Sequence, residues 1–230
     1  MVGTDGRTGN ESLSRMTAAS VTVLPVSEKV DLKKTDPYLA KAGQFRILEV
    51  PPQRYLAIDG KGDPNTAVFA EAVEALFPLA YAVKFQSKRE LGRDYVVMPL
   101  EALWWADDMS TFTTRRDKSS WSWTLLVLQP DWVDEALVDA ARTAVAKKGA
   151  PPRSADIRFE TVEEGRSVQT LHVGPFDDEG PVLARLHDEF LPENGLAPTG
   201  RHHEIYLSDL RRTAPEKLRT ILRQPVGPLC

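Results

Sequence analysis

The sequence predicts an α+β fold, in which duplicated strand–helix–strand–strand units form a pseudo-twofold antiparallel sheet with a central ligand cleft. The first observation is an internal repeat, because residues 45–62 (FRILEVPPQRYLAIDGKG) and residues 157–174 (IRFETVEEGRSVQTLHVG) align without a gap. The second observation is that a helix pattern and two strand patterns follow each of these stretches. We therefore expect the two units to share one sheet.

The first repeat spans about residues 45–130. Its opening stretch has β-rich residues on both sides of PPQR, which indicates two strands joined by a turn. Residues 63–83 then offer an aspartate and an asparagine as helix caps, and their apolar residues recur near helical spacing. Residues 96–105 (VVMPLEALWW) and 123–130 (WTLLVLQP) are the predicted last two strands of this unit.

The second repeat spans about residues 157–225 and has the same order of elements. Residues 177–191 predict a helix, and residues 200–209 (GRHHEIYLSD) and 219–225 (RTILRQP) predict the last two strands. Between the repeats, residues 131–148 have one apolar side, which is typical of an amphipathic helix. The glycine and prolines of the following GAPPRS end that helix.

Composition restricts the class of protein. Residues 1–29 have no apolar core and are rich in Gly, Ser and Thr, so we expect a disordered N-terminal tail before a single domain of residues 30–230. The net charge of −4 does not indicate a nucleic-acid partner, and no run approaches the ~20 apolar residues of a membrane helix. Cys230 is the only cysteine, which favours a reducing, cytoplasmic setting.

The strand predicted over residues 200–209 has an unusual polar face. Strand alternation places His202, Glu204 and Tyr206 together on this face. The opposite face includes His203 but is otherwise apolar, and we expect it to pack on the helices as ordinary core. Matching Glu101 to Glu204 in the two repeats predicts that both carboxylates face the groove between the repeats. The adjacent histidines cannot bind one metal ion, because neighbours in a strand point to opposite faces.

Tryptophans accompany the predicted groove. The strands of the first repeat contain four of them, Trp104, Trp105, Trp121 and Trp123. Aromatic walls attract flat or cationic ligands by roughly 0.5–2 kcal/mol per contact, and a carboxylate that loses hydration in such a wall has a raised pKa. Structural interpretations stay open for each residue. Tryptophans in strands often belong to the core, Glu101 can be a surface or salt-bridge residue, and Glu204 can have a structural hydrogen-bonding role.

Several longer stretches carry a family resemblance, namely KVDLKKTDPYLAK, VMPLEALWWADD, WSWTLLVLQPDWV, RFETVEEG, HVGPFDDEGP and HHEIYLSDLRRTAPEKLRTILRQPV. With them, residues 30–225 resemble the GyrI-like small-molecule-binding family. This resemblance implies a duplicated fold with a pocket in which a glutamate, here Glu204, meets cationic drugs between aromatic residues. The sequence is most similar to the stand-alone branch with cyclopropanoid cyclopropyl hydrolases, which open the strained cyclopropane of DNA-alkylating natural products.

The resemblance implies a hydrolase hypothesis without a metal or organic cofactor. Glu204 would orient or deprotonate the water that attacks the cyclopropane carbon, and Tyr206 would donate a hydrogen bond to the oxygen that gains charge. The candidate ligand-binding residues are Tyr81, Glu101, Trp104, Trp105, Trp121, Trp123 and His202. The expected partner is therefore a hydrophobic or cationic small molecule, and the protein is expected to be a monomer or a homodimer.

Two other classes of protein remain open. A non-catalytic binder would sequester the drug or a cationic metabolite with the same pocket, and Glu204 would be its counter-ion. A protein-interaction module would act through its outer surface. An enzyme releases product and a binder only protects its ligand, whereas an interaction module keeps its activity when Glu204 is changed to Gln.

Overall fold

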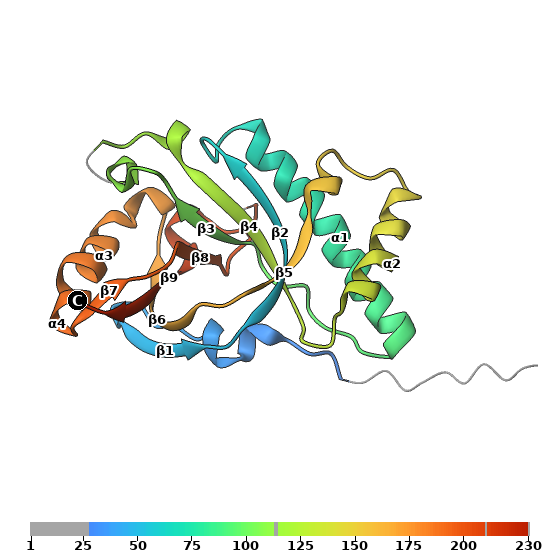
Figure 1. The fold of residues 1–230 in the computed structure, drawn as a ribbon, viewed down its shortest axis with the longest axis horizontal. Helices are drawn as coiled ribbons and strands as arrows, with labels where there is room; N and C mark the ends of the chain where they lie inside the picture. Colours follow the sequence, from blue (N-terminus) through green and yellow to red (C-terminus); the bar gives the residue numbers. More distant parts are fainter. Residues whose placement is uncertain (1–27, 113–114, 210, 230) are drawn as a thin grey trace, which may run out of the picture.

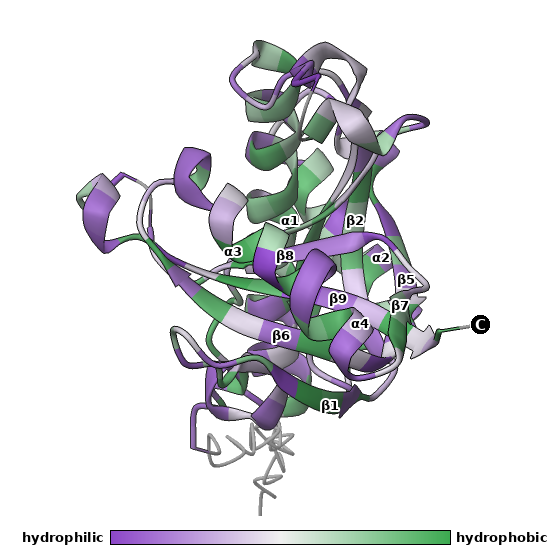
Figure 2. Cartoon of the chain, turned by 90° about the vertical axis from the view of Figure 1, so that its left-hand side faces the viewer, coloured by the Kyte–Doolittle hydropathy of each residue, from purple (hydrophilic) through white to green (hydrophobic). Residues whose placement is uncertain are grey.

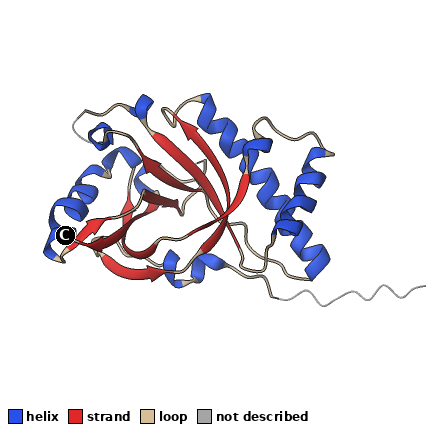
Figure 3. Cartoon of the chain, viewed as in Figure 1, coloured by secondary structure: helices blue, strands red, loops and turns tan. Residues whose placement is uncertain are grey.

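The computed structural model describes residues 28–112, 115–209 and 211–229, and most of the predicted N-terminal tail lies outside these residues. A twisted antiparallel sheet forms the centre of the protein, with α1 and α2 beside one half and α3 and α4 beside the other (Figure 1). The strands are β1 (Arg46–Val50), β2 (Gln53–Lys61), β3 (Glu101–Trp105), β4 (Ser122–Gln129), β5 (Arg158–Val162), β6 (Gly165–Val173), β7 (Leu196–Pro198), β8 (His202–Tyr206) and β9 (Arg219–Pro228). The helices (Figure 3) are α1 (Ala67–Leu91), α2 (Glu135–Ala146), α3 (Gly180–Ala184) and α4 (Leu191–Glu193), with a π-helical stretch, Arg185–Phe190, between the last two.

The strand order is symmetric in the two repeats. The sheet runs β1-β6-β9-β8-β3-β4-β2-β5, and β7 pairs with β9. The first strand of each repeat therefore lies beside the second strand of the other repeat. These two ladders pair Glu49 with Arg166 and Arg54 with Thr161, which is the symmetric register that the gap-free alignment requires. The predicted α+β class with a pseudo-twofold antiparallel sheet is confirmed.

Local sequence sets the ends of the helices. Asp134 caps α2, because its side chain accepts a hydrogen bond of 2.9 Å from the backbone N–H of Leu137. The helix is therefore shorter than the one predicted over residues 131–148. Gly92 ends α1 with a φ of 66°, the left-handed conformation that favours glycine. No helix in the described part of the chain is long and apolar enough to cross a membrane.

One face of the sheet is covered by helices. α1 and α2 enclose a core on β2, β3 and β4 that includes Leu76, Trp123 and Val138. The helical segment from α3 to α4 encloses a second core around Leu186 and Val168, on β6 and β9. Both hydrophobic and hydrophilic residues occur along β6 and β9, as Figure 2 shows. The central strands β3 and β8 lie between these two helical layers.

The opposite face carries a third core without residues from α1 to α4. This core includes Tyr55, Leu126 and Ile205, and the chain segment of residues 32–40 packs against it. The prediction that the apolar face of β8 packs on helices is therefore wrong. The helices cover the face that carries Glu204, and the N-terminal segment covers the apolar one.

Candidate functional site

Glu204 and Tyr206 lie at the centre of the sheet, on the face between the helical layers. The ladder of β3 and β8 pairs Ala102 with Glu204 and Trp104 with His202, so these side chains share one face. The hydroxyl of Tyr206 donates a hydrogen bond of 2.7 Å to Oε2 of Glu204 and accepts one of 3.2 Å from the indole Nε1 of Trp104. Both repeats thus contribute to one hydrogen-bonded chain at the pseudo-twofold axis.

Aromatic rings surround this chain of hydrogen bonds, and they are Phe69, Trp104, Phe112, Trp121 and Phe176. Trp104 meets Trp121 edge to face with centroids 5.8 Å apart, and Trp121 stacks on Phe112 at 4.5 Å. From the second repeat, Phe176 lies edge-on to Tyr206 at 5.4 Å. Such walls favour flat, hydrophobic ligands. The structure brings Trp104 and Trp121 into contact, and their role as walls of a ligand site stays a prediction.

Burial changes the acid–base chemistry of Glu204. Only 15% of its side chain is exposed. Burial raises its pKa to about 7, although the hydrogen bond from Tyr206, the nearby indole N–H of Trp104 and the charge of His203 act in the opposite direction. The pKa of Tyr206 is raised well above its usual value by burial and by the nearby Glu204. Glu204 therefore exchanges its proton near neutral pH, which suits a general base, while Tyr206 stays protonated.

His202 adds a neutral polar group to this face. Its Nε2 lies 3.8 Å from Oε1 of Glu204, and both ring nitrogens are buried without a hydrogen-bond partner among the described residues. Burial and the neighbouring His187 and His203 lower its pKa to about 3, so the ring is uncharged at neutral pH. His202 thus shares the face of Glu204, and its role in ligand binding stays a prediction.

Glu179 is a second carboxyl group at the site, and sequence reasoning missed it. It lies at the start of α3, is 5% exposed, and its Oε1 has no hydrogen-bond partner in the described chain. Burial, followed by the charges of Glu204 and Asp177, raises its pKa to about 10, so it is protonated at neutral pH. The only signal was the acidic run before Gly180, which a helix start explains equally well. Within the described residues no group of three or more His, Cys, Asp or Glu side chains is placed to hold a metal ion.

Glu101 does not share the face of Glu204, and this prediction is wrong. The β3–β8 ladder pairs Glu101 with Ile205, so its side chain enters the core of the opposite face, where it accepts a hydrogen bond of 2.6 Å from Tyr38. When the symmetric register of β2 and β6 is followed through β4 and β9, the counterpart of Glu101 is His203. The matching of Glu101 to Glu204 was displaced by one residue, and in a strand one residue changes the face.

Two residues that were predicted to line the ligand site, Trp105 and Tyr81, lie away from the aromatic rings around Glu204 and Tyr206. Trp105 alternates onto the face of Glu101, where the guanidinium carbon of Arg201 lies 3.6 Å from the centroid of its ring. Tyr81 extends from α1 and is 49% exposed. Neither ring takes part in the contacts around Glu204, so the prediction that both line the same wall is not supported by their positions.

Trp123 belongs to the core beneath the aromatic cluster. It pairs across the strands with Trp104 on one side and with Gly60 on the other, and its ring is fully buried. Its Nε1 donates a hydrogen bond of 3.2 Å to the carbonyl of Gly62. The ring therefore supports Trp104 from below, which is the structural interpretation of a strand tryptophan.

The two repeats are also tied together by charges near the site. Asp177, next to Phe176, forms ion pairs with Arg116 and, at 3.5 Å, with Lys118 of the β3–β4 connection. The same connection contributes Phe112 to the aromatic cluster. These ion pairs hold together the two chain segments that supply rings from opposite repeats.

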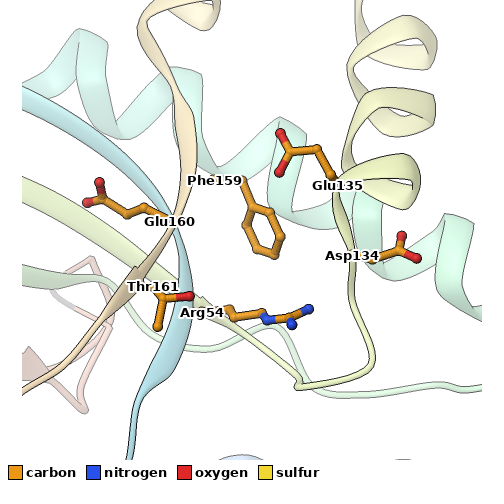
Figure 4. A pocket seen from close by; sticks show the side chains of 6 residues that line it. All are labelled: Arg54, Asp134, Glu135, Phe159, Glu160 and Thr161. Carbon is orange, nitrogen blue, oxygen red and sulfur yellow. The ribbon is translucent and has the colours of Figure 1, made fainter.

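Two cavities of the described chain lie away from Glu204. One, of about 350 Å³, opens between β2, β5 and the start of α2 (Figure 4), and its lining residues are Arg54, Asp134, Glu135, Phe159, Glu160 and Thr161. The other, of about 480 Å³, lies beside residues 38–46, with Gln169 in its wall. Neither of these two cavities is lined by Glu204, Tyr206 or the aromatic rings around them.

The chain belongs to the GyrI-like family, because the family model described as the GyrI-like small molecule binding domain matches residues 43–226. This match covers both repeats and, apart from the last two residues of β9, all strands of the main sheet. It makes the class of protein a small-molecule-binding module. No curated protein sequence matches the chain.

Solved structures from Listeria innocua are similar over most of the chain. An uncharacterized conserved protein is 38% identical, with a TM-score of 0.79 over 86% of this chain and 100% of that one. Two hydrolase structures are 36% and 35% identical, with TM-scores of 0.75 and 0.77 over 86% and 87% of this chain and 100% of theirs. The EcmrR C-terminal domain, at 14% identity and a TM-score of 0.50 over 80% of this chain and 98% of that domain, shares the fold.

Proposed function

We propose that the protein binds flat, hydrophobic aromatic molecules beside Glu204 and hydrolyses the cyclopropane of DNA-alkylating natural products, which detoxifies them. The observation that carries this proposal is the pair of buried carboxyl groups, Glu204 with a pKa of about 7 and Glu179 with a pKa of about 10. Two carboxyl groups whose environments separate their pKa values can serve as base and acid in one reaction. The similarity to two hydrolases supports a hydrolytic reaction.

In the proposed reaction, ionised Glu204 accepts a proton from a water molecule whose oxygen attacks a carbon of the cyclopropane. The new C–O bond forms while a C–C bond of the ring breaks, and the electron pair of that bond moves to a conjugated carbonyl oxygen. Protonated Glu179 donates its proton to this oxygen, so that one water is added overall. Solvent then carries the proton of Glu204 back to Glu179, which restores both groups.

Tyr206 supports this chemistry by positioning Glu204. Its single hydroxyl proton is already donated to Glu204, and its oxygen accepts the Trp104 indole N–H. The family resemblance implied that Tyr206 donates a hydrogen bond to the substrate oxygen. For this, the hydroxyl would have to turn away from Glu204. Glu179 has a proton and an oxygen without a partner in the described chain, and it is the better proton donor.

A second candidate function is the binding of a lipophilic cation without turnover. The observation that favours it is that no Lys or Arg side chain of the described residues forms an ion pair with Glu204, whose neighbouring imidazole, His202, is uncharged. A buried carboxylate without a counter-ion gains from a cation that enters between aromatic rings. The two candidate functions use the same site, and only hydrolysis forms a product.

The test is the turnover of a cyclopropane-bearing DNA alkylator by the wild type and by Glu204→Gln, followed by the mass of the product. We expect the wild type to add one water, and Glu204→Gln to bind the compound but to turn it over about 10²-fold or more slowly. Glu74→Gln, an exposed change on α1, is the matched control and should behave as the wild type. Tight binding without product from any of the three proteins would contradict hydrolysis and leave a sequestering protein.

A further inference from the structure

His203 is the centre of a buried cluster of charges on the far side of the sheet from Glu204. Its Nδ1 lies 3.0 Å from Oε1 of Glu164, and its Nε2 lies 3.0 Å from Oε2 of Glu101. The second contact is an ion pair without the alignment of a hydrogen bond. Burial opposes a charge on His203, but Glu164 and Glu101 outweigh it and raise its pKa to about 9. The ring is therefore an imidazolium at neutral pH.

Neighbouring hydrogen bonds fix this cluster in place. Arg223 contacts Oε2 of Glu164 at 2.7 Å, donates a hydrogen bond of 3.0 Å to Gln169, and donates one of 2.5 Å to the carbonyl of Pro37. Tyr38 donates its hydroxyl proton to the other oxygen of Glu101, at 2.6 Å. Two basic and two acidic side chains thus balance one another inside the protein, which keeps the His203 ring in one position.

No Lys or Arg side chain of the described residues forms an ion pair with Glu204 on its own face, and the cations beside the aromatic rings, Arg116 and Lys118, are paired with Asp177. The titratable and polar groups of the described chain that face Glu204 or its direct neighbours are Trp104, Asp177, Glu179, His187, His202 and Tyr206. Tyr206 and Glu179 hold their protons at neutral pH, and His202 is uncharged. Nothing among them supplies a positive charge that favours ionised Glu204.

His203 supplies that charge through the sheet. It directly precedes Glu204 in β8, so the two side chains leave adjacent Cα atoms toward opposite faces. Because both groups are buried, their interaction is weakly screened by solvent. The charge of His203 accordingly favours the ionised form of Glu204.

We propose that His203 is a positioning residue which, held as an imidazolium by Glu101 and Glu164, keeps Glu204 ionised from the far side of the sheet. This inference deepens the proposed function and rests on it, because an ionised Glu204 serves both as a general base and as a counter-ion. The cluster sets the protonation of the site without touching a ligand. It also gives Glu101 and Glu164, which are buried on the face of His203, a role in the chemistry of Glu204 on the other face.

The experiment is a titration of the Glu204 carboxyl carbon by NMR in protein labelled with ¹³C-glutamate, with the signal assigned by its loss in Glu204→Gln. We expect His203→Gln to raise the midpoint by about one pH unit, because the imidazolium is removed. We expect Glu101→Gln to lower the midpoint, because it removes an anion while Glu164 still holds His203 charged. A purely structural role for the cluster would not produce shifts of opposite sign.

Ile205→Val is the control, because it changes the packing of the same face without changing its charge, and it should leave the midpoint where it is. An unchanged or lowered midpoint in His203→Gln would overturn the proposal. If His203→Gln does not fold, Glu101→Gln decides alone, and an unchanged or raised midpoint overturns it. The titration needs no substrate, so it tests the role of His203 independently of turnover. If the midpoints move as expected but the protein turns over no substrate, hydrolysis is refuted and the role of His203 stands.

Discussion

At the scale of single residues, the environment gives two glutamates different chemistry. Glu204 accepts a hydrogen bond from Tyr206 and feels the charge of His203, which partly offset the effect of burial on its pKa. Glu179 is buried with one oxygen unpartnered in the described chain, and the charge of Glu204 raises its pKa further. One group is therefore ready to accept a proton at neutral pH while the other holds one.

Glu179→Gln should separate binding from chemistry. Glutamine has the shape and the neutral charge of protonated Glu179 but has no acidic proton to donate, so we expect ligand affinity to be retained and turnover to fall by about 10²–10⁴-fold. Isothermal titration and product formation at pH 7 would measure the two quantities. Glu189→Gln, an exposed change in the π-helical stretch, is the control. Unchanged turnover in Glu179→Gln would mean that another group, such as Tyr206, donates the proton.

The sequence predicts those site residues that a strand holds. Alternation along β8 is enough to place His202, Glu204 and Tyr206 together, because its other face is buried and fixes the register. Glu179 has no such constraint. It lies where a loop enters a short helix, and its burial depends on the packing of that loop against β8, which no local pattern records.

At the scale of elements, the register of β3 could not be predicted from the sequence. The gap-free alignment fixes β1, β2, β5 and β6, but a helix and connections of different length separate them from β3 and β8. Nearly all side chains of β3 are buried, on both faces, so no alternation of polar and apolar residues marks which face is which. An error of one residue therefore moved Glu101 to the wrong face, and with it the prediction of a second carboxylate in the groove.

The pairing of β2 with β4 predicts a strict requirement for glycine at position 60. A Cβ atom there would lie 2.0 Å from the ring of Trp123, which is fully buried and cannot move aside freely. We expect Gly60→Ala to lower the free energy of unfolding by about 1–3 kcal/mol or more, since overpacking forces strain into the core. Urea denaturation would measure the loss.

Gly180→Ala is the matched control for this change, because a Cβ atom there meets nothing within 4 Å. Its position in the first turn of α3 also suits alanine. We expect its free energy of unfolding to stay close to that of the wild type. Equal stability of Gly60→Ala and the wild type would mean that the indole of Trp123 has room to shift.

At the scale of the whole molecule, the two repeats depend on one another through exchanged strands. β1 is hydrogen-bonded to β6 and β5 to β2, so neither repeat contains its own complete sheet. The duplication and the shared sheet follow from the sequence. The exchange of first strands between the repeats does not follow from the sequence. A first strand buries the same face and satisfies the same alternation of residues whether it pairs within its own repeat or with the other repeat.

The shifted pKa values predict that the folded protein is most stable in weakly acidic solution. The pKa of Glu164 is lowered to about 2, mainly by His203 and Arg223 against the effect of burial, so its contribution is present above about pH 4.3 and is lost as the pH falls toward 2. The pKa of His203 is raised to about 9, so its contribution is complete below about pH 6.5 and is lost as the pH rises through 9. Both contributions are therefore complete only between about pH 4.3 and 6.5.

The two carboxyl groups of the site also lower the stability of the folded protein as the pH rises. Glu204 and Glu179 have raised pKa values, so the folded state holds protons that the unfolded chain releases above about pH 4.3, and stability falls as the pH rises toward 7 and 10. The pKa of His202, lowered to about 3, acts in the opposite direction below about pH 6.5. Denaturation curves between pH 3 and pH 10 should therefore show a broad maximum between about pH 4.3 and 6.5. The double change Glu179→Gln with Glu204→Gln should flatten the decline between pH 5 and pH 8, whereas Glu74→Gln should not. A stability that rises from pH 6 to pH 9 in the wild type would contradict the assigned protonation of all three raised groups, because each of them binds more protons in the folded state over that range.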